Sequence, residues 1–289
     1  MSLCRDFKRT WCKEGIAVSD GMKLLNGREL AGFIKERQAH QVRSLRQAHK
    51  IFPKLAIVVT IEHPVIDVYI RLKQQYGADI LVDVDVYRVK QAEVPTLLDS
   101  LNTDDSVHGI IIQLPLEDST QTEELVNLVA PEKDVDALGR LAVYDPATPM
   151  AILWLLAGYN VDFTGKHILL IGRGKLVGAP LEKILKASGH DVMVADRRTP
   201  DLRAETLKSD IIITAAGSPA LLFSDMVKDG AVVVDAGVAS EDGKTVGDVA
   251  PEMYEREDIT ITPPKGGVGP LTVCALFDNV IRAARGAAE

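Results

Sequence analysis

The stretch HILLIGRGKLVGAPL, residues 167–181, carries the clearest fold signal in the chain. An apolar run typical of a buried strand precedes three glycines, Gly172, Gly174 and Gly178, and a helical pattern follows them. A strand, a glycine-rich turn and a helix N-terminus form an anion site, because backbone N–H groups and the helix dipole point at the ligand. The spacing G-x-G-x-x-x-G is one residue wider than the usual dinucleotide fingerprint. A tight turn without a ligand is the alternative, although Arg173 favours a phosphate.

Strand and helix patterns alternate on both sides of this stretch. Downstream, strands are predicted over residues 191–196, 211–217, 231–237 and 259–264. These runs are nearly continuously apolar, as expected when helices cover both faces of a parallel sheet. Upstream, strands are predicted over 54–61, 80–89 and 108–116. Helices are predicted over 26–49, 65–77 (closed by Gly77), 92–102, 120–129, 145–160, and from Pro270 to about Arg285. The sequence therefore predicts an α/β protein with two domains, doubly wound parallel sheets and a cleft between the domains.

Composition narrows the class of partner. The chain has 289 residues and a formal net charge of −8, without a basic stripe interleaved with aromatic residues, which argues against nucleic acid. The three cysteines have neither metal-ligand spacing nor the number expected of a disulfide framework, so no metal is predicted and a reducing cytosol fits. The apolar stretch AILWLLAG is too short to cross a bilayer. Residues 1–21 are expected to be a disordered leader, with Met22 as a possible natural start.

The second strand after the glycine loop bears on the choice of dinucleotide. It ends at Asp196, and Arg197 and Arg198 follow. An acid here binds the ribose 2′-OH of NAD, whereas an arginine accepts the 2′-phosphate of NADP. The two arginines together with Arg173 favour NADP, and NAD stays open. The alternative is that Arg197 and Arg198 are solvated loop residues.

Four further patterns have both a functional and a structural interpretation. Tyr69 and Lys73 share a helix face at i and i+4, as ordinary amphipathic surfaces also do. Gln113 stands at the carboxyl end of an apolar strand, where open α/β sheets bind ligands, or caps a turn. Asp134 and Asp136 lie in a loop, where surface acids are common. Residues 266–269 form a glycine-rich turn, or a backbone lying against a ligand.

The order and spacing of these motifs are more specific than any one of them. Y-x-x-x-K, G-x-x-x-Q-L-P-L, K-D-V-D, T-P (Thr148 and Pro149), G-R-G-x-x-V-G-x-P, V-G-D-V and G-G-V-G-P-x-T follow one another. The set resembles the bifunctional methylenetetrahydrofolate dehydrogenase/cyclohydrolase family, from about Lys23 to Arg285. The resemblance implies a folate-binding catalytic domain over 22–147 with the last helix, 270–289, packed back on it. It also implies a Rossmann-type NAD(P)-binding domain over 148–269, with the folate in the cleft.

The resemblance also implies an activity. The family oxidises 5,10-methylenetetrahydrofolate with NADP⁺ and hydrolyses the methenyl product to 10-formyltetrahydrofolate. Members are usually cytosolic homodimers in one-carbon metabolism and purine biosynthesis. By resemblance Lys73 is the acid/base group, Gln113 hydrogen-bonds it, Tyr69 stacks on the folate, and Asp136 binds the pterin. The implied substrate-binding residues are Tyr69, Gln113, Leu114, Pro115, Asp136, Gly266, Gly267 and Pro270. The implied cofactor-binding residues are Gly172, Arg173, Gly174, Val177, Gly178, Arg197, Arg198, Ala216, Gly217 and Val238.

The chain departs from the family pattern near Lys73 and in the cofactor loop. Ile66 replaces a serine, Gln75 replaces a basic residue, and Gly174 replaces the serine after the loop arginine. Ile61 and Lys265 are further departures. The first two bear on the balance of the two activities, and Gly174 with Asp196 bears on the cofactor. A dehydrogenase of another small substrate, or a non-catalytic nucleotide-binding regulator on the same fold, are the alternative functions.

Overall fold

The computed structural model describes residues 23–241 and 244–287, and the expected leader and Met22 lie outside the described residues. The described chain divides into two compact units. The three-stranded unit comprises residues 32–147 and 273–287, and the six-stranded unit comprises residues 23–31 and 148–272. In this part of the chain, no helix combines the length and the apolar character needed to cross a membrane.

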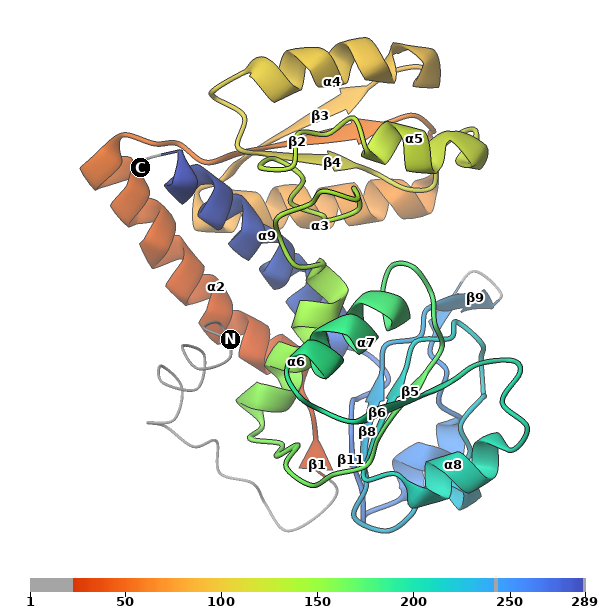
Figure 1. Ribbon diagram of the computed structural model, residues 1–289. Coiled ribbons are helices and arrows are strands. Elements are labelled where there is room, and N and C mark those ends of the chain that lie inside the picture. The colour runs from red at the N-terminus through yellow and green to blue at the C-terminus, as the bar shows by residue number, and fades with distance from the viewer. Residues whose placement is uncertain (1–22, 242–243, 288–289) are drawn as a thin grey trace. The chain divides into compact units, whose positions relative to one another are not determined.

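The three-stranded unit is built on a parallel sheet in the order β3-β2-β4. Its strands are β2 (Lys54–Val59), β3 (Asp83–Arg88) and β4 (Gly109–Ile112). Helix α4 lies on one face of this sheet and α3 on the other (Figure 1). The helical elements that lie wholly or mostly in this unit are α2 (Gly27–Ser44), η1 (Leu45–His49), α3 (Pro64–Ile80), η2 (Gln91–Glu93), α4 (Val94–Thr103), η3 (Ser119–Gln121), α5 (Thr122–Val126) and α9 (Val268–Gly286).

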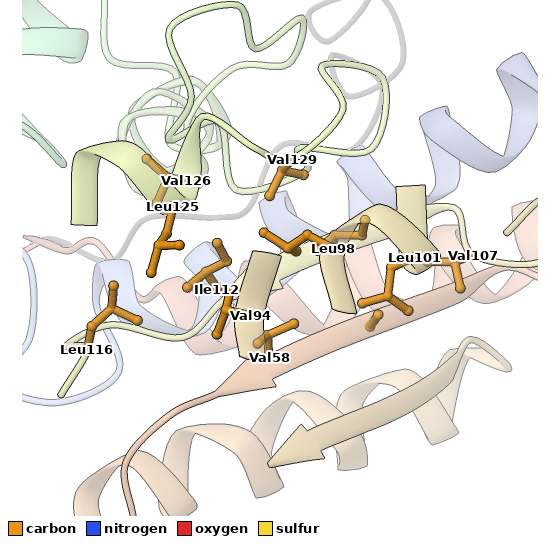
Figure 2. Packing of buried hydrophobic residues seen from close by; sticks show 12 residues of the cluster. Val58, Val94, Leu98, Leu101, Val107, Ile112, Leu116, Leu125, Val126 and Val129 are labelled. Carbon is orange, nitrogen blue, oxygen red and sulfur yellow. The ribbon is translucent and has the colours of Figure 1, made fainter. Parts of the chain in front are cut away.

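A buried apolar cluster holds α4 and α5 against this sheet. Figure 2 shows Val58 of β2 and Ile112 of β4 facing Val94 and Leu98 of α4, with Leu125 of α5 beside them. All four residues of β4 are buried, which matches its uninterrupted apolar sequence. The carboxyl end of β4 is therefore fixed by packing from both faces, and Gln113 follows directly after it.

The end of α3 differs from the prediction that Gly77 closes it. The helix continues to Ile80 and ends at Leu81 in the left-handed region, with φ 66°. A Cβ on Gly77 would lie 2.5 Å from Val84 Cγ2 and 3.3 Å from Phe277 Cε1. Glycine thus stands there because α3 approaches β3 and α9 closely, and not because it ends the helix.

The six-stranded unit contains a parallel sheet in the order β1-β11-β8-β7-β5-β6. Its strands are β1 (Lys23–Leu24), β5 (Ile168–Ile171), β6 (Val192–Ala195), β7 (Ile211–Thr214), β8 (Val232–Asp235) and β11 (Thr260–Ile261). A separate antiparallel pair joins β9 (Ala239–Glu241) and β10 (Lys244–Val246). The helical elements are α6 (Ala147–Gly158), α7 (Gly178–Ala187), α8 (Leu202–Lys208), η4 (Ser224–Met226) and η5 (Pro251–Glu255).

The two parallel sheets with helices between their strands confirm the predicted α/β fold class. Strand β1, which is too short to give a sequence pattern, pairs with β11. The last helix begins at Val268, so the prediction that it begins at Pro270 is wrong by two residues. Pro270 still lies in the first turn, where a missing N–H costs no helical hydrogen bond.

Candidate functional site

Helix α3 presents Tyr69 and Lys73 one turn apart. Its start is well defined, because Pro64 stands in the first turn and His63 Nδ1 accepts the Val65 N–H at 3.2 Å. The four-residue spacing then puts Tyr69 and Lys73 on the same side of the helix. Tyr69 is 43% exposed, so its ring is open to a stacking partner, whereas Lys73 is half-buried.

The Lys73 amine reaches the residue that follows β4. Lys73 Nζ donates to Gln113 Oε1 at 2.7 Å. The Gln113 backbone N–H donates to Val58 O at 2.9 Å, and its side-chain Nε2 donates to Leu114 O at 2.9 Å. Because Nε2 is committed to Leu114, the amide oxygen is left to accept from Lys73. The predicted contact between Lys73 and Gln113 is therefore present.

Asp136 completes a cluster of polar and charged side chains that we call the Lys73 centre (Lys73, Gln113 and Asp136). Burial lowers the pKa of the Lys73 amine from its ordinary value, and the Asp136 carboxylate opposes that shift. Burial likewise raises the pKa of the Asp136 carboxyl, with Lys73 opposing the shift and Asp134 adding to it. Both shifts favour the neutral forms, so the amine can accept a proton nearer neutral pH than an exposed lysine.

Two residues outside the predicted site shape the loop that carries Asp136. Asp134 Oδ2 accepts the Gly139 N–H at 2.7 Å, so this carboxylate holds the turn and is structural. Asn279 of α9, which is buried, donates through Nδ2 to Val135 O and to Asp145 O, both at 2.9 Å. The sequence analysis missed Asn279. Its one signal is an amide among the apolar residues of an amphipathic helix, which also fits an ordinary helix residue.

The remaining predicted substrate residues fall in two places. Leu114 is partly buried against the cluster of Figure 2, and Pro115 is exposed. Gly266, Gly267 and Pro270 belong to the six-stranded unit, where the Arg28 N–H donates to Gly266 O at 2.9 Å. Gly266 has φ +89°, a value that L side chains rarely adopt, so the turn needs glycine there.

Most of the predicted cofactor residues follow the carboxyl ends of β5, β7 and β8, and Arg197 and Arg198 follow β6. A Cβ on Gly178 would lie 2.1 Å from Gly172 O, and one on Gly172 would lie 2.5 Å from Ala215 O. One on Gly217 would lie 3.3 Å from Val238 O. Close backbone packing therefore explains these glycines. We call the set the glycine edge: Gly172, Gly178, Ala216, Gly217 and Val238.

Gly174 and Val177 stand at the mouth of the glycine loop. A Cβ added to Gly174 would meet no atom within 4 Å, so the space beside it is open, and Val177 is the N-cap residue of α7. An open, glycine-lined loop at the start of a ten-residue helix suits the phosphates of a dinucleotide.

Two of the three arginines predicted to bind phosphate, Arg173 and Arg198, are held by carboxylates. Arg173 Nε lies 3.1 Å from Glu182 Oε2, and Lys186 Nζ lies 2.7 Å from Glu182 Oε1. Arg198 Nη2 lies 2.9 Å from Asp196 Oδ2, and the Arg198 N–H donates to Asp196 Oδ1 at 2.8 Å. Bonds from Arg198 lower the pKa of Asp196, and the charge of Arg173 adds to the effect. Arg197 is exposed.

Two carboxylates beside the glycine edge, the buried Asp248 and the partly buried Asp235, were not predicted as site residues. Asp248 accepts the backbone N–H groups of Ala216 and Ser218, and Asp235 lies beside it. The V-G-D-V motif that contains Asp248 was recognised in the sequence, but its role depends on backbone contacts that residue types alone do not reveal.

Comparison with known proteins decides the family. Residues 25–136 match the model of the tetrahydrofolate dehydrogenase/cyclohydrolase catalytic domain, and residues 146–288 match the NAD(P)-binding domain of the same enzymes. The chain belongs to the tetrahydrofolate dehydrogenase/cyclohydrolase family. Bifunctional protein FolD of Francisella philomiragia is 35% identical over 278 residues, covering 91% of this chain and 99% of that protein.

Solved structures agree. Bifunctional FolD methylenetetrahydrofolate dehydrogenase/cyclohydrolase of Campylobacter jejuni is 35% identical, with a TM-score of 0.86 over 92% of this chain and 99% of that one. The methylenetetrahydrofolate dehydrogenase-cyclohydrolase (FolD) of Trypanosoma brucei, solved with NADP and an inhibitor, is 28% identical. Its TM-score is also 0.86, over 93% of this chain and 99% of that one. The six-stranded unit, which contains most of the matched NAD(P)-binding region, is thus the dinucleotide-binding part of a folate enzyme.

Proposed function

We propose that this protein oxidises 5,10-methylenetetrahydrofolate with NADP⁺ and hydrolyses the resulting methenyl form to 10-formyltetrahydrofolate. The observation that carries the proposal is the Lys73 centre: an amine of lowered pKa, bonded to Gln113 at 2.7 Å, beside the carboxyl group of Asp136. It lies in the unit that contains most of the region matched by the family's catalytic-domain model.

The oxidation needs positioning more than acid or base catalysis. When bound, NADP⁺ supplies the hydride acceptor, and the chain holds it in place. The glycine loop and the start of α7 suit its phosphates, and Arg173, Arg197 and Arg198 would hold its 2′-phosphate. NADP is favoured over NAD because both carboxylate oxygens of Asp196 are already bonded to Arg198, which competes with a ribose hydroxyl.

The hydrolysis needs proton transfers, and these fall to Lys73. The methenyl carbon is electrophilic because two nitrogens share its positive charge. The neutral Lys73 amine accepts a proton from the attacking water, which leaves a neutral hydroxyl adduct, and the same proton is returned to the ring nitrogen whose bond to the carbon breaks. The hydroxyl proton of the adduct leaves to solvent as the formyl carbonyl forms, so the reaction releases one proton in all. Gln113 holds the amine through its oxygen, and Asp136 accepts hydrogen bonds from the pterin ring. Tyr69 stacks on the folate.

Two departures from the family pattern weaken hydrolysis relative to oxidation. Ile66 is 4% exposed and offers no hydroxyl where the family has serine. Gln75 donates to Asp79 Oδ1 at 2.8 Å and brings no charge toward Lys73. Both residues lie on α3, which carries the proton-transfer group, and neither lies at the glycine edge.

We further propose the setting in which the enzyme works. It is a cytoplasmic homodimer of one-carbon metabolism, and its 10-formyl product serves purine biosynthesis. Its catalytic domain spans 22–147 with 270–289, and its cofactor domain spans 148–269. Within the three-stranded unit Leu114 and Pro115 contact the folate, and within the six-stranded unit Gly174 and Val177 complete the cofactor site.

A paired assay tests the proposed function. The purified protein is given methylenetetrahydrofolate with NADP⁺ or NAD⁺, and separately the methenyl compound without cofactor. The proposal expects NADP⁺ reduction and opening of the methenyl ring. Turnover of a hydroxy or amino acid with no folate activity would instead favour another dehydrogenase. Tight dinucleotide binding without any folate turnover would favour the non-catalytic regulator.

A further inference from the structure

Asp248 is a fully buried aspartate, and its carboxylate accepts hydrogen bonds from the loop that follows β7. Its Oδ2 accepts the Ala216 N–H at 2.8 Å and its Oδ1 accepts the Ser218 N–H at 2.6 Å. Both carboxylate oxygens are thus used to shape the backbone around Gly217, which has φ +63°. Because the Asp248 side chain has no exposed surface, a change that breaks one of these bonds leaves a buried polar group unpaired.

Asp235, at the end of β8, fixes the segment that carries Asp248. Its Oδ1 accepts the Asp248 N–H at 3.1 Å and the Gly237 N–H at 2.9 Å, and its Oδ2 accepts the Val249 N–H at 3.1 Å. A Cβ on Gly237 would lie 2.1 Å from Asp248 Cγ, so this carboxylate lies directly against the β8 loop. The two carboxylates therefore connect the loops after β7 and β8.

The β7 loop in turn packs against the glycine loop and the β8 loop. Ala215 O lies 2.5 Å from where a Cβ of Gly172 would be, and Val238 O lies 3.3 Å from where a Cβ of Gly217 would be. A displacement of the β7 loop would consequently change its contact with the β8 loop at Val238, while the glycine loop keeps its own close packing of Gly178 against Gly172.

The strand order indicates which half of the dinucleotide these loops face. Strand β6 lies on one side of β5 and β7 on the other, which makes the β5–β7 edge the switch point where the pyrophosphate binds. The acid at the end of β6 marks the adenosine ribose. The nicotinamide half therefore extends over the ends of β7 and β8.

We propose that Asp248, supported by Asp235, is a positioning residue that holds the β7 and β8 loops in the shape that binds the nicotinamide half of NADP. This inference rests on the proposed function of the six-stranded unit. It assigns to the V-G-D-V segment a role in hydride transfer, and none in the hydrolysis that the Lys73 centre carries out.

The test is Asp248→Asn, an isosteric change that places an NH₂ donor against one backbone N–H. Three quantities are measured: the Kd of NADP⁺, the Kd of 2′,5′-ADP as the adenosine half alone, and the rate of methenyl hydrolysis without cofactor. The expected result is a loss of about tenfold or more in NADP⁺ affinity, since a buried donor is left unpaired. We expect 2′,5′-ADP affinity and hydrolysis to stay within about twofold, because neither involves these loops. Asp235→Asn should give the same pattern.

Met253→Ala is the matched control, since Met253 is fully buried in the same unit but belongs to the core cluster of the sheet. It should lower the melting temperature and change the affinities for NADP⁺ and 2′,5′-ADP by the same factor. Unchanged NADP⁺ affinity in both aspartate variants would overturn the inference. Equal losses for NADP⁺ and 2′,5′-ADP, as general loosening would give, would also overturn it. A wild-type protein that turns over no folate would instead refute the proposed function.

Discussion

The Lys73 centre and the glycine edge solve different problems by different means. At the Lys73 centre the chemistry belongs to side chains, whose protonation is set by burial and by one neighbouring charge. At the glycine edge we propose that the backbone itself contacts the dinucleotide, and missing Cβ atoms at Gly172 and Gly178 allow the loops to pack. A shift of the backbone should therefore impair the Lys73 centre, because it moves the one amine that transfers protons. A change of side chain should impair the glycine edge only where the new side chain displaces the backbone.

Removing the Lys73 amine should give the largest difference between the two sites. Lys73→Met should lower the rate of methenyl hydrolysis by about 10²- to 10⁴-fold, the usual contribution of a positioned acid/base group. The Kd of NADP⁺ should not change, because the glycine edge is untouched. Stopped-flow hydrolysis and calorimetric binding measure the two. Lys183→Met, at an exposed position of α7, is the control and should alter neither. Hydrolysis at the wild-type rate in Lys73→Met would reject the role given to the amine.

The second substitution adds a Cβ to the glycine edge and leaves the Lys73 centre unchanged. Gly172→Ala puts a Cβ 2.5 Å from Ala215 O at φ +104°, so NADP⁺ affinity should fall by about tenfold or more through backbone strain. Gly174→Ala meets no atom within 4 Å and should bind NADP⁺ within about threefold of wild type. Hydrolysis without cofactor should be normal in both. Equal NADP⁺ affinity in the two variants would contradict the packing explanation.

The sequence predicted the elements of the fold more completely than the supports of the site. Apolar strands such as β4 and β5 are recognisable because they are buried on both faces, and the spacing of Tyr69 and Lys73 follows from helix geometry alone. The end of α3 was misplaced because Gly77 serves tertiary packing. Strand β1 was not seen because two residues carry no period.

The supports were missed for a different reason. Asn279, Asp235 and Asp248 act on backbone groups distant in sequence, and their residue types fit ordinary helix or loop positions equally well. Arg173 and Arg198 were expected to face phosphate, but their carboxylate partners Glu182 and Asp196 could not be assigned from spacing. Contacts between side chains and remote backbone leave no periodic pattern in a sequence.

A substitution in α9 tests what holds the loop that carries Asp136, and its expected effect is smaller. Asn279→Leu removes both donors that hold Val135 O and Asp145 O, leaving two buried carbonyls unpaired. The variant should unfold with a free energy lower by about 1–3 kcal/mol and should raise the KM for methenyltetrahydrofolate several-fold. Urea denaturation and steady-state kinetics measure these effects. NADP⁺ affinity should be unaffected, and an unchanged KM would show that the loop does not depend on α9.

The smallest expected effect is a shift in pH dependence. Hydrolysis requires the neutral amine, so its kcat should rise with pH through the lowered pKa of Lys73 and level off above it. The Asp136 charge raises that pKa, so Asp136→Asn should lower it further and move the ascending limb toward lower pH. A limb that moves toward higher pH would contradict the sign of this interaction.

The most direct test of the account is the titration of Lys73 itself. With ¹³C-labelled lysine and Lys73→Met for assignment, the Cε resonance reports the pKa of this amine in the folded protein. The account predicts a pKa below the ordinary lysine value of 10.5, because burial outweighs the attraction of Asp136. A Lys73 that titrates at or above that value would contradict it.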